Sequence, residues 1–153
     1  MNEDAKWMQR AFELGKKAKE HEEVPVGAVI VHENKIIGEG WNQPISSQDP
    51  TAHAEIIALR DAGNNVGNYR LPDATMYVTL EPCSMCAGAI VHARLAKVVL
   101  AVADPKTGAC GSVFNLLQTD ELNHKVEIDK GIMEDECRLL IQTFFKEKRK
   151  KPS

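Results

Sequence analysis

The stretches Asp49-Pro50-Thr51-Ala52-His53-Ala54-Glu55 and Glu81-Pro82-Cys83-Ser84-Met85-Cys86 hold the polar groups around which the chain is arranged. Between them they offer one imidazole, two thiols separated by two residues, and a carboxylate two residues after the imidazole. Catalytic zinc sites use three protein ligands and leave the fourth place to water, whereas structural sites fill all four. We therefore predict a zinc ion bound by His53, Cys83 and Cys86.

Each half of this pattern also has a plainer interpretation. A lone C-x-x-C is often a redox pair or half of a structural zinc site, and a lone H-x-E is often a solvated helix face. The other two cysteines, Cys110 and Cys137, stand alone, so no second C-x-x-C completes a four-thiolate site. Taken together, the halves match H-x-E followed by P-C-x-x-C, a signature of zinc-dependent nucleobase deaminases.

Glu55 is the predicted catalytic residue. Residues two apart in a helix point about 200° from one another, so Glu55 and His53 are not expected to bind one metal face together. A glutamate is long enough to reach round beside the metal. Zinc lowers the pKa of bound water from about 16 towards about 7, and a nearby carboxylate can then move its proton.

The length of the chain predicts one domain over residues 1–153. The chain is 43% hydrophobic and 27% charged, which is ordinary for a globular protein. It has no apolar N-terminal run and no stretch long enough to cross a membrane, so we expect a cytoplasmic protein without a membrane partner. In that compartment the cysteines are expected to be reduced thiols or metal ligands.

The formal charge of −3 is unevenly distributed. Residues 146–151 carry five of the nineteen basic residues and one of the twenty-two acidic ones. A basic end of this kind can simply be a solvated terminus. The alternative is that the short tail of residues 146–153 meets a polyanion, and RNA is the obvious one if the site takes a nucleobase.

Hydrophobic periodicity predicts helices and strands in alternation. The expected strands are 24–31, 36–41, 75–79, 97–102 and 126–128. The expected helices are 3–21, one opened by Pro50 with Asp49 or Thr51 as its cap and running to about Gly63, 83–92, a short one at 113–117, and a last one carrying Met133 to Phe145. The sum is a three-layer α/β/α fold with a mixed central sheet and helices on both faces.

Beyond the zinc motifs, the chain resembles the bacterial tRNA-specific adenosine deaminases of the cytidine deaminase-like superfamily, nearly from end to end. Motifs in both halves carry the likeness: Val24-Pro25-Val26-Gly27-Ala28-Val29, Trp41-Asn42, the two stretches quoted above with Tyr77-Val78-Thr79-Leu80 before the second, Cys86-Ala87-Gly88-Ala89, Asp104, Lys106-Thr107-Gly108-Ala109 and Asn123-His124.

This resemblance implies a cytidine deaminase-like fold and a homodimer with one zinc ion per subunit. It implies conversion of the wobble adenosine of an arginine tRNA to inosine, with Glu55 shuttling protons and the tRNA anticodon stem-loop as partner. The residues that match the family's nucleotide or anticodon contacts are Asn42, Asp104, Lys106, Asn123, Phe145 and Arg149.

Several interpretations stay open at this stage. Phe145 either stacks on a base or continues the core stripe of the last helix, and Arg149 either contacts a phosphate or ends a solvated helix. The competing functions are a free-base or nucleoside deaminase acting on guanine or cytidine, and a non-catalytic RNA-binding subunit with a structural zinc. We assign none of the other histidines to zinc, namely His21, His32, His92 and His124.

Overall fold

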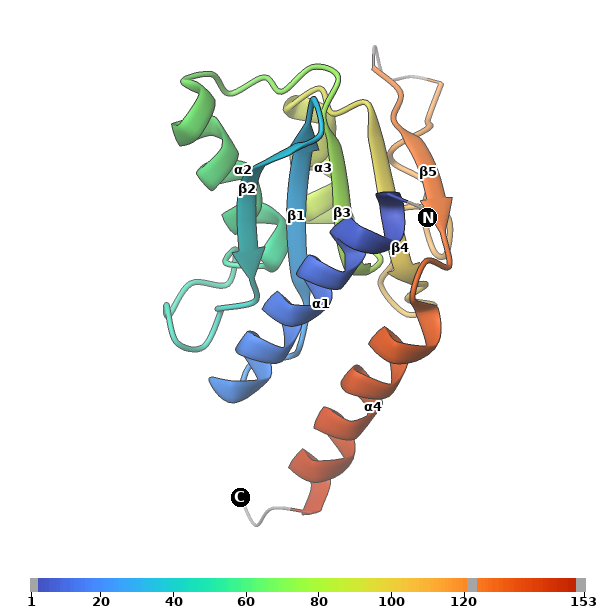
Figure 1. Cartoon of the computed structure of the whole chain (residues 1–153). Helices are drawn as coiled ribbons and strands as arrows, with labels where there is room; N and C mark the ends of the chain where they lie inside the picture. Colours follow the sequence, from blue (N-terminus) through green and yellow to red (C-terminus); the bar gives the residue numbers. More distant parts are fainter. Residues whose placement is uncertain (1–2, 121–123, 151–153) are drawn as a thin grey trace.

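The computed structural model of the chain describes residues 3–120 and 124–150. In chain order the elements are α1 (Glu3–Glu20), β1 (Gly27–His32), β2 (Lys35–Trp41), α2 (Ala54–Val66), β3 (Thr75–Leu80), α3 (Ser84–His92), β4 (Lys97–Val102), β5 (Glu127–Lys130) and α4 (Glu134–Lys150) (Figure 1). None of the helices within these described residues is long and apolar enough to cross a membrane.

The five strands form one mixed sheet in the order β2-β1-β3-β4-β5. β1 pairs antiparallel with both β2 and β3, and β3, β4 and β5 run parallel to one another. Two parallel neighbours need a crossover connection, and α3 supplies it between β3 and β4. The strands expected at 24–31 and 36–41 thus pair as a hairpin, and those expected at 75–79 and 97–102 flank the expected helix at 83–92.

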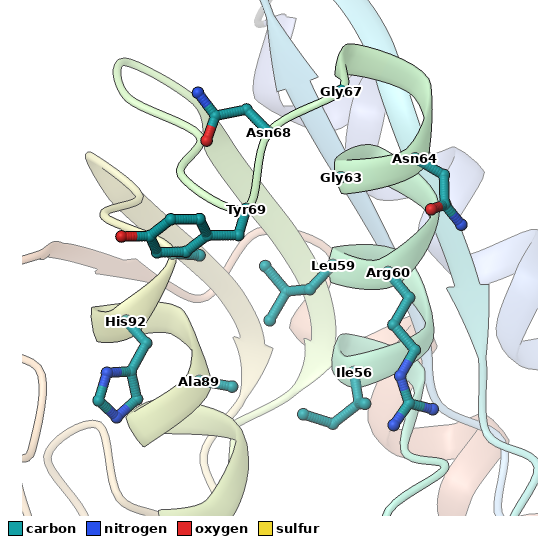
Figure 2. A pocket seen from close by; sticks show the side chains of 11 residues that line it. Ile56, Leu59, Arg60, Gly63, Asn64, Gly67, Asn68, Tyr69, Ala89 and His92 are labelled. Carbon is teal, nitrogen blue, oxygen red and sulfur yellow. The ribbon is translucent and has the colours of Figure 1, made fainter.

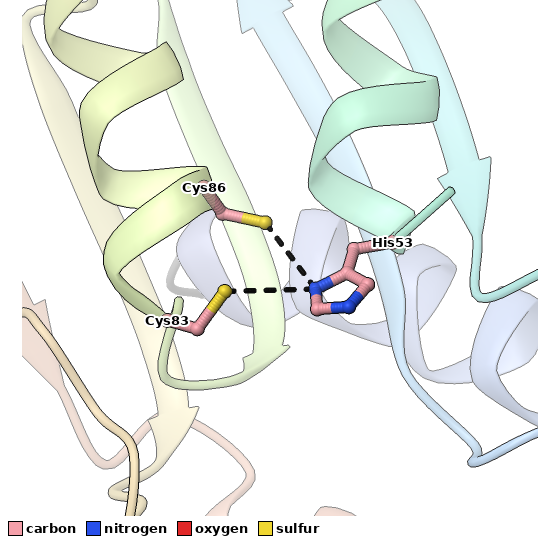
Figure 3. A group of neighbouring side chains, drawn as sticks. All are labelled: His53, Cys83 and Cys86. Atoms are coloured by element: carbon pink, nitrogen blue, oxygen red, sulfur yellow. Dashed lines mark hydrogen bonds between the residues drawn. The ribbon is translucent and has the colours of Figure 1, made fainter. Parts of the chain in front are cut away.

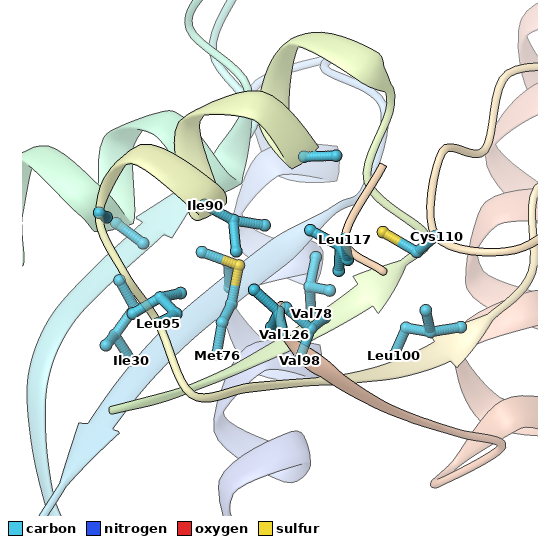
Figure 4. Close-up of a cluster of buried hydrophobic side chains, with 14 of the residues drawn as sticks. Ile30, Met76, Val78, Ile90, Leu95, Val98, Leu100, Cys110, Leu117 and Val126 are labelled. Carbon is cyan, nitrogen blue, oxygen red and sulfur yellow. The ribbon is translucent and has the colours of Figure 1, made fainter. Parts of the chain in front are cut away.

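Helices cover both faces of the sheet, as predicted. On one face, strand residues such as Ile30, Met76 and Val98 pack with residues of α2 and α3, including Ala58 and Ile90 (Figure 4). Strand residues alternate in direction, so the intervening positions point the other way. Large side chains such as Met76 and Ile90 are fully buried, and truncating either to alanine should cost about 2–5 kcal/mol.

The opposite face of the sheet is covered by α1 and α4. Val29, Tyr77 and Val99 contact a second cluster that includes Met8 of α1 and Cys137 of α4. Cys137 is buried, so the last helix turns it towards the sheet. α1 lies across the middle strands, whereas the C-terminal half of α4 extends past the end of the sheet (Figure 1).

The first strand begins later than predicted. The sequence run from Val24 favours a strand, but Pro25 lacks an N–H and the Val26 N–H donates to the Val24 carbonyl at 2.8 Å. β1 therefore starts at Gly27. A side chain at Gly27 would lie 2.0 Å from the Ala11 carbonyl oxygen, so the strand can approach α1 this closely only with glycine.

The second helix also begins later than predicted. Asp49 Oδ1 accepts the Thr51 N–H at 2.9 Å and the Thr51 hydroxyl at 2.7 Å, so Asp49 caps a local turn rather than a helix. His53 is the N-cap of α2, with an extended backbone at φ −72° and ψ 155°. The helix continues past Gly63 to Val66, where Gly67 at φ 72° ends it.

The short helix predicted over residues 113–117 does not form. The N–H groups of Val113 and Phe114 both donate to the Gly108 carbonyl, and Cys110 forms an isolated bridge with Asn115. The segment therefore folds back on itself as a series of turns. By contrast, residues 146–150 of the predicted basic tail continue α4 as a helix, and residues 151–153 lie outside the described part of the chain.

Candidate active site

Two helix N-termini on the same face of the sheet bring the zinc-binding side chains together. His53 is the N-cap of α2 and Cys83 is the N-cap of α3, both with extended backbone. Pro82 follows the end of β3 and stops the strand, so that Cys86 falls in the first turn of α3. Both halves of the site therefore come from helix starts.

The three donor atoms are spaced as a tetrahedral zinc requires. His53 Nδ1 lies 3.6 Å from Cys83 Sγ and 3.5 Å from Cys86 Sγ (Figure 3). Zinc bonds of about 2.0–2.1 Å to nitrogen and about 2.3 Å to sulfur place these atoms about 3.6 Å apart. Within residues 3–120 and 124–150, this is the one His/Cys/Asp/Glu group whose ligand atoms all lie within 4.8 Å of one another. The residues present therefore fit one zinc ion.

The two thiols are held close enough to share a proton when no metal is bound. The Cys86 thiol donates to Cys83 and His53 adds a second hydrogen bond, which together lower the pKa of Cys83 to about 4. The same hydrogen bond and burial raise the pKa of Cys86. A thiolate beside an imidazole at a helix N-terminus is the form that binds a metal cation.

Glu55 lies beside the three donors without joining them. Its side chain is 4% exposed in the first turn of α2 and hydrogen-bonds with the Cys86 thiol. Burial raises the pKa of Glu55 to about 7, with the Cys83 thiolate acting in the same direction. A carboxyl group of this pKa can both take and give a proton near neutral pH.

A second feature is a cavity of about 650 Å³ between α4 and the segment that follows β4. Asp104, Lys106 and Phe145, three of the residues matched to RNA contacts, line it together. Phe145 is 42% exposed, whereas its neighbour Phe144 is 7% exposed and fills the core position. None of the zinc-site residues lines this cavity.

The remaining predicted contacts lie elsewhere. Asn42 is half-buried just after β2, and Arg149 is exposed in the last turn of α4. Asn123 lies outside the described residues. The Nε2–H group of His124 donates a hydrogen bond to the Leu95 carbonyl at 2.7 Å, which is a structural contact.

The structure adds polar residues that the sequence did not single out. Arg138 and Gln142 of α4 line the same cavity as Phe145. Two further carboxylates, Glu23 and Glu81, are almost fully buried. Glu23 accepts hydrogen bonds from Ile45 N–H and from the N–H and hydroxyl of Ser46, and so holds the segment after Asn42. Glu81 stands in the second of the quoted stretches, but no local pattern indicates its partners or those of Glu23, because they are far away in sequence.

Comparison with known proteins agrees with this site. The family of the cytidine and deoxycytidylate deaminase zinc-binding region matches residues 1–102, which include all three zinc-binding side chains and Glu55. The architecture and the donor set are thus those of a zinc-dependent deaminase.

Relatives that match most of the chain indicate which kind of deaminase it is. A tRNA-specific adenosine deaminase of Haemophilus influenzae is 51% identical over 147 residues, 95% of this chain and 85% of the relative. A solved structure from studies of A-to-I editing by tRNA:A34 deaminases is 38% identical, with a TM-score of 0.85 over 88% of this chain and 97% of that one. A guanine deaminase of Bacillus subtilis is 42% identical, with a TM-score of 0.63, over 67% of this chain and 66% of that one. The chain belongs to the zinc-dependent cytidine and deoxycytidylate deaminase family and, within it, to the tRNA-specific adenosine deaminases.

Proposed function

We propose that the protein hydrolyses adenosine to inosine at the wobble position of a tRNA anticodon and releases ammonia. The observation that carries the proposal is the geometry of His53, Cys83 and Cys86, with the buried Glu55 carboxyl beside them. A structural zinc would have four protein ligands. The three-donor group, with an acid-base residue next to it, supports catalysis over a purely structural metal.

The chain's own residues then have distinct roles in the proposed reaction. Bound zinc supplies a Lewis acid that lowers the pKa of water from about 16 to about 7. Glu55 would take the first proton that this water loses and give it to the adenine ring nitrogen beside the attacked carbon. It would then take the second proton, from the hydroxyl now on that carbon, and give it to the departing amine. Water oxygen ends on the base, the amine leaves as ammonia, and Glu55 returns to its starting state.

The cavity beside α4 supports an RNA substrate. An anticodon loop presents unpaired bases, so moving one into a pocket costs less than opening a duplex. We propose that Phe145 stacks on a base of the loop, with Asp104 and Lys106 on the opposite wall. Arg149 and the other cations at the end of α4 would meet phosphates, and Asn42 and Asn123 are proposed as further contacts.

The test is inosine formation by the zinc-loaded protein on an arginine tRNA transcript, because the resemblance implies arginine tRNA. Free adenosine, cytidine and guanine are assayed beside it. Inosine at the wobble position with inert small substrates is the expected result. Ammonia from a small substrate, with the tRNA unchanged, would overturn the RNA substrate while keeping the zinc chemistry.

A free-base deaminase is the second candidate. The match to a guanine deaminase at 42% identity favours this alternative over other small substrates, although it covers only part of each chain. Guanine turnover at a rate that exceeds tRNA turnover would decide for it.

We also propose that two copies of the chain associate through the surface formed by α2 and α3. Ile56, Leu59 and Tyr69 line a broad hollow of about 940 Å³ there, rimmed by Arg60 and His92 (Figure 2). Tyr69 is 70% exposed, and apolar surface with a polar rim is typical of protein interfaces.

Sedimentation of the wild type and of Tyr69→Glu tests the homodimer. The proposal predicts a dimer for the wild type and a monomer, or a much weaker dimer, for the variant. A wild-type monomer at micromolar concentration would contradict it.

Because the proposed substrate is tRNA, we further propose a cytoplasmic location for the protein.

A further inference from the structure

A buried carboxylate outside the zinc site, that of Glu81, collects four hydrogen bonds from one loop. Glu81 is 4% exposed. Its Oε1 accepts the Asp104 N–H at 3.0 Å, and its Oε2 accepts the N–H groups of Cys110 at 2.9 Å and Ser112 at 3.1 Å. The Ser112 hydroxyl donates the fourth bond, to Oε1. Residues 104–112 thus form a loop wrapped around one side chain.

This loop carries two of the predicted substrate contacts, Asp104 and Lys106. Asp104 shapes the turn by accepting the Lys106 N–H at 3.0 Å and the Thr107 hydroxyl at 2.8 Å. Glu81 in turn binds the Asp104 N–H, so the carboxylate of Asp104 is placed by the carboxylate of Glu81.

The same residue is tied to the zinc-binding helix. Glu81 lies two residues before Cys83 in the chain, and its own N–H donates to the Val102 carbonyl at 2.8 Å. The Ala109 N–H donates to the Pro82 carbonyl at 2.9 Å. The segment that leads to the thiol and the loop that faces the cavity are therefore joined at Glu81 and Pro82.

The loop also leaves no room around this anchor. A side chain on Gly108 would lie 2.3 Å from Glu81 Cδ and 2.5 Å from the Asp104 carbonyl oxygen. The Glu81 carboxylate is therefore held both by close packing against Gly108 and by hydrogen bonds from the loop.

We propose that Glu81 is a positioning residue that sets Asp104 and Lys106 at a fixed place relative to the zinc site. The inference rests on the proposed function, because the loop is taken to contact the RNA substrate. The hydrogen bonds of the Glu81 side chain all go to the loop, and none goes to His53, Cys83 or Cys86. Its contribution is to the placement of the loop.

The isosteric substitution Glu81→Gln separates this role from simple space filling. Each carboxylate oxygen accepts from at least one backbone N–H, so in either orientation an amide NH2 in place of one oxygen faces an N–H from which it cannot accept. Leaving buried donors unpaired weakens the anchor, and we expect kcat/KM on the anticodon stem-loop to fall by about 10- to 100-fold. Most of the loss should appear in KM, with zinc content unchanged.

A matched control is Glu33→Gln. This variant removes the same charge from an exposed residue in the turn between β1 and β2. A second perturbation of the anchor is Ser112→Ala, which removes one donor from an exposed position. It should give a smaller loss of the same kind, and it keeps the inference testable if Glu81→Gln fails to fold.

Hydrogen exchange tests the inference without any activity. In Glu81→Gln the amides of Asp104, Cys110 and Ser112 should exchange at least about 10-fold faster than in the wild type, while those of β3 and β4 keep their protection. Unchanged protection of the three loop amides would overturn the inference, whatever the substrate is. Failure of the proposed function alone would leave the exchange result standing.

A double-mutant cycle supplies the kinetic test. If Glu81 acts through Asp104, then Glu81→Gln should cost less than about 3-fold in an Asp104→Ala background. Fully additive losses, or a loss of zinc in Glu81→Gln, would show that Glu81 acts by another route and would overturn the positioning role.

Discussion

Glu55 and Glu81 are equally buried, at 4% exposure each, and yet their carboxyl groups behave in opposite ways. Burial raises the pKa of Glu55 to about 7. Burial also acts to raise the pKa of Glu81, but hydrogen bonds from the Ser112 hydroxyl and from three backbone N–H groups outweigh it, so that pKa lies below its ordinary value.

The difference shows how a fold assigns roles to identical side chains. A buried carboxylate surrounded by donors is held ionised and in place, which suits it to anchor a loop. A buried carboxylate with few donors can change its protonation state near neutral pH, which suits it to acid-base chemistry. The number of hydrogen-bond donors around each group, rather than its burial, decides between the two.

The largest expected effect is that of Glu55→Gln on turnover. The variant keeps the shape of the side chain and removes its ability to carry a proton, so kcat should fall by at least about 10³-fold. Metal analysis should find zinc at the wild-type level. Loss of zinc would mean that Glu55 is a zinc ligand. Glu55 would then differ from Glu81 by binding the metal and not by acid-base chemistry.

Cys83→Ser tests the three zinc ligands beside Glu55. A hydroxyl is a poor zinc ligand compared with a thiolate, so zinc content after dialysis should fall well below one ion per chain. Activity should fall with it and return only in part with added zinc. A variant that keeps full zinc would contradict the assignment of three ligands.

Thermal unfolding of Glu55→Gln and Glu81→Gln compares how much each carboxylate contributes to stability. Glu81→Gln leaves buried donors unpaired, which costs roughly 1–3 kcal/mol, or a decrease in Tm of about 2–10 °C for a chain of this size. Glu55→Gln removes no comparable set of hydrogen bonds and should change Tm by less. Equal decreases at the two positions would break the contrast.

Phe145→Ala should act on substrate binding alone. Stacking of a base on an aromatic ring is worth about 1–3 kcal/mol, so KM for the stem-loop should rise by about 5- to 150-fold. Phe144 fills the core beside it, and therefore the stability of Phe145→Ala should stay close to that of the wild type. A large loss of stability with unchanged KM would return Phe145 to a packing role.

The smallest expected effect is that of Arg149→Ala. One phosphate contact at an exposed helix end should change affinity only several-fold and should lower the salt dependence of binding by about one unit of slope. Binding curves at three or more salt concentrations would measure this. An unchanged slope would leave Arg149 as a solvated helix end.

The zinc-binding residues could be predicted from sequence because their chemistry is local. His53, Cys83 and Cys86 are recognisable by residue type and spacing, and the helix and strand pattern around them follows from hydrophobic periodicity. Errors arose where side chains compete for backbone groups. Asp49 was a plausible helix cap, but its carboxylate bonds Thr51 two residues away.

The roles of the loop residues could not be predicted in this way. The partners of Glu81 lie 23 to 31 residues further along the chain, and no short motif records them. The helix expected over 113–117 was wrong because its first N–H groups turn back to the Gly108 carbonyl. Only the three-dimensional fold shows that Glu81, a residue beside the zinc motif, accepts hydrogen bonds from the loop that lines the cavity next to α4.

The most direct test of this account is inosine formation from an arginine tRNA stem-loop, measured under single-turnover conditions for the zinc-loaded wild type, Glu55→Gln and Glu81→Gln. The account predicts that saturating RNA restores most of the rate in Glu81→Gln and none of it in Glu55→Gln. Equal losses in both variants at saturating RNA would contradict the division of roles between the two carboxylates.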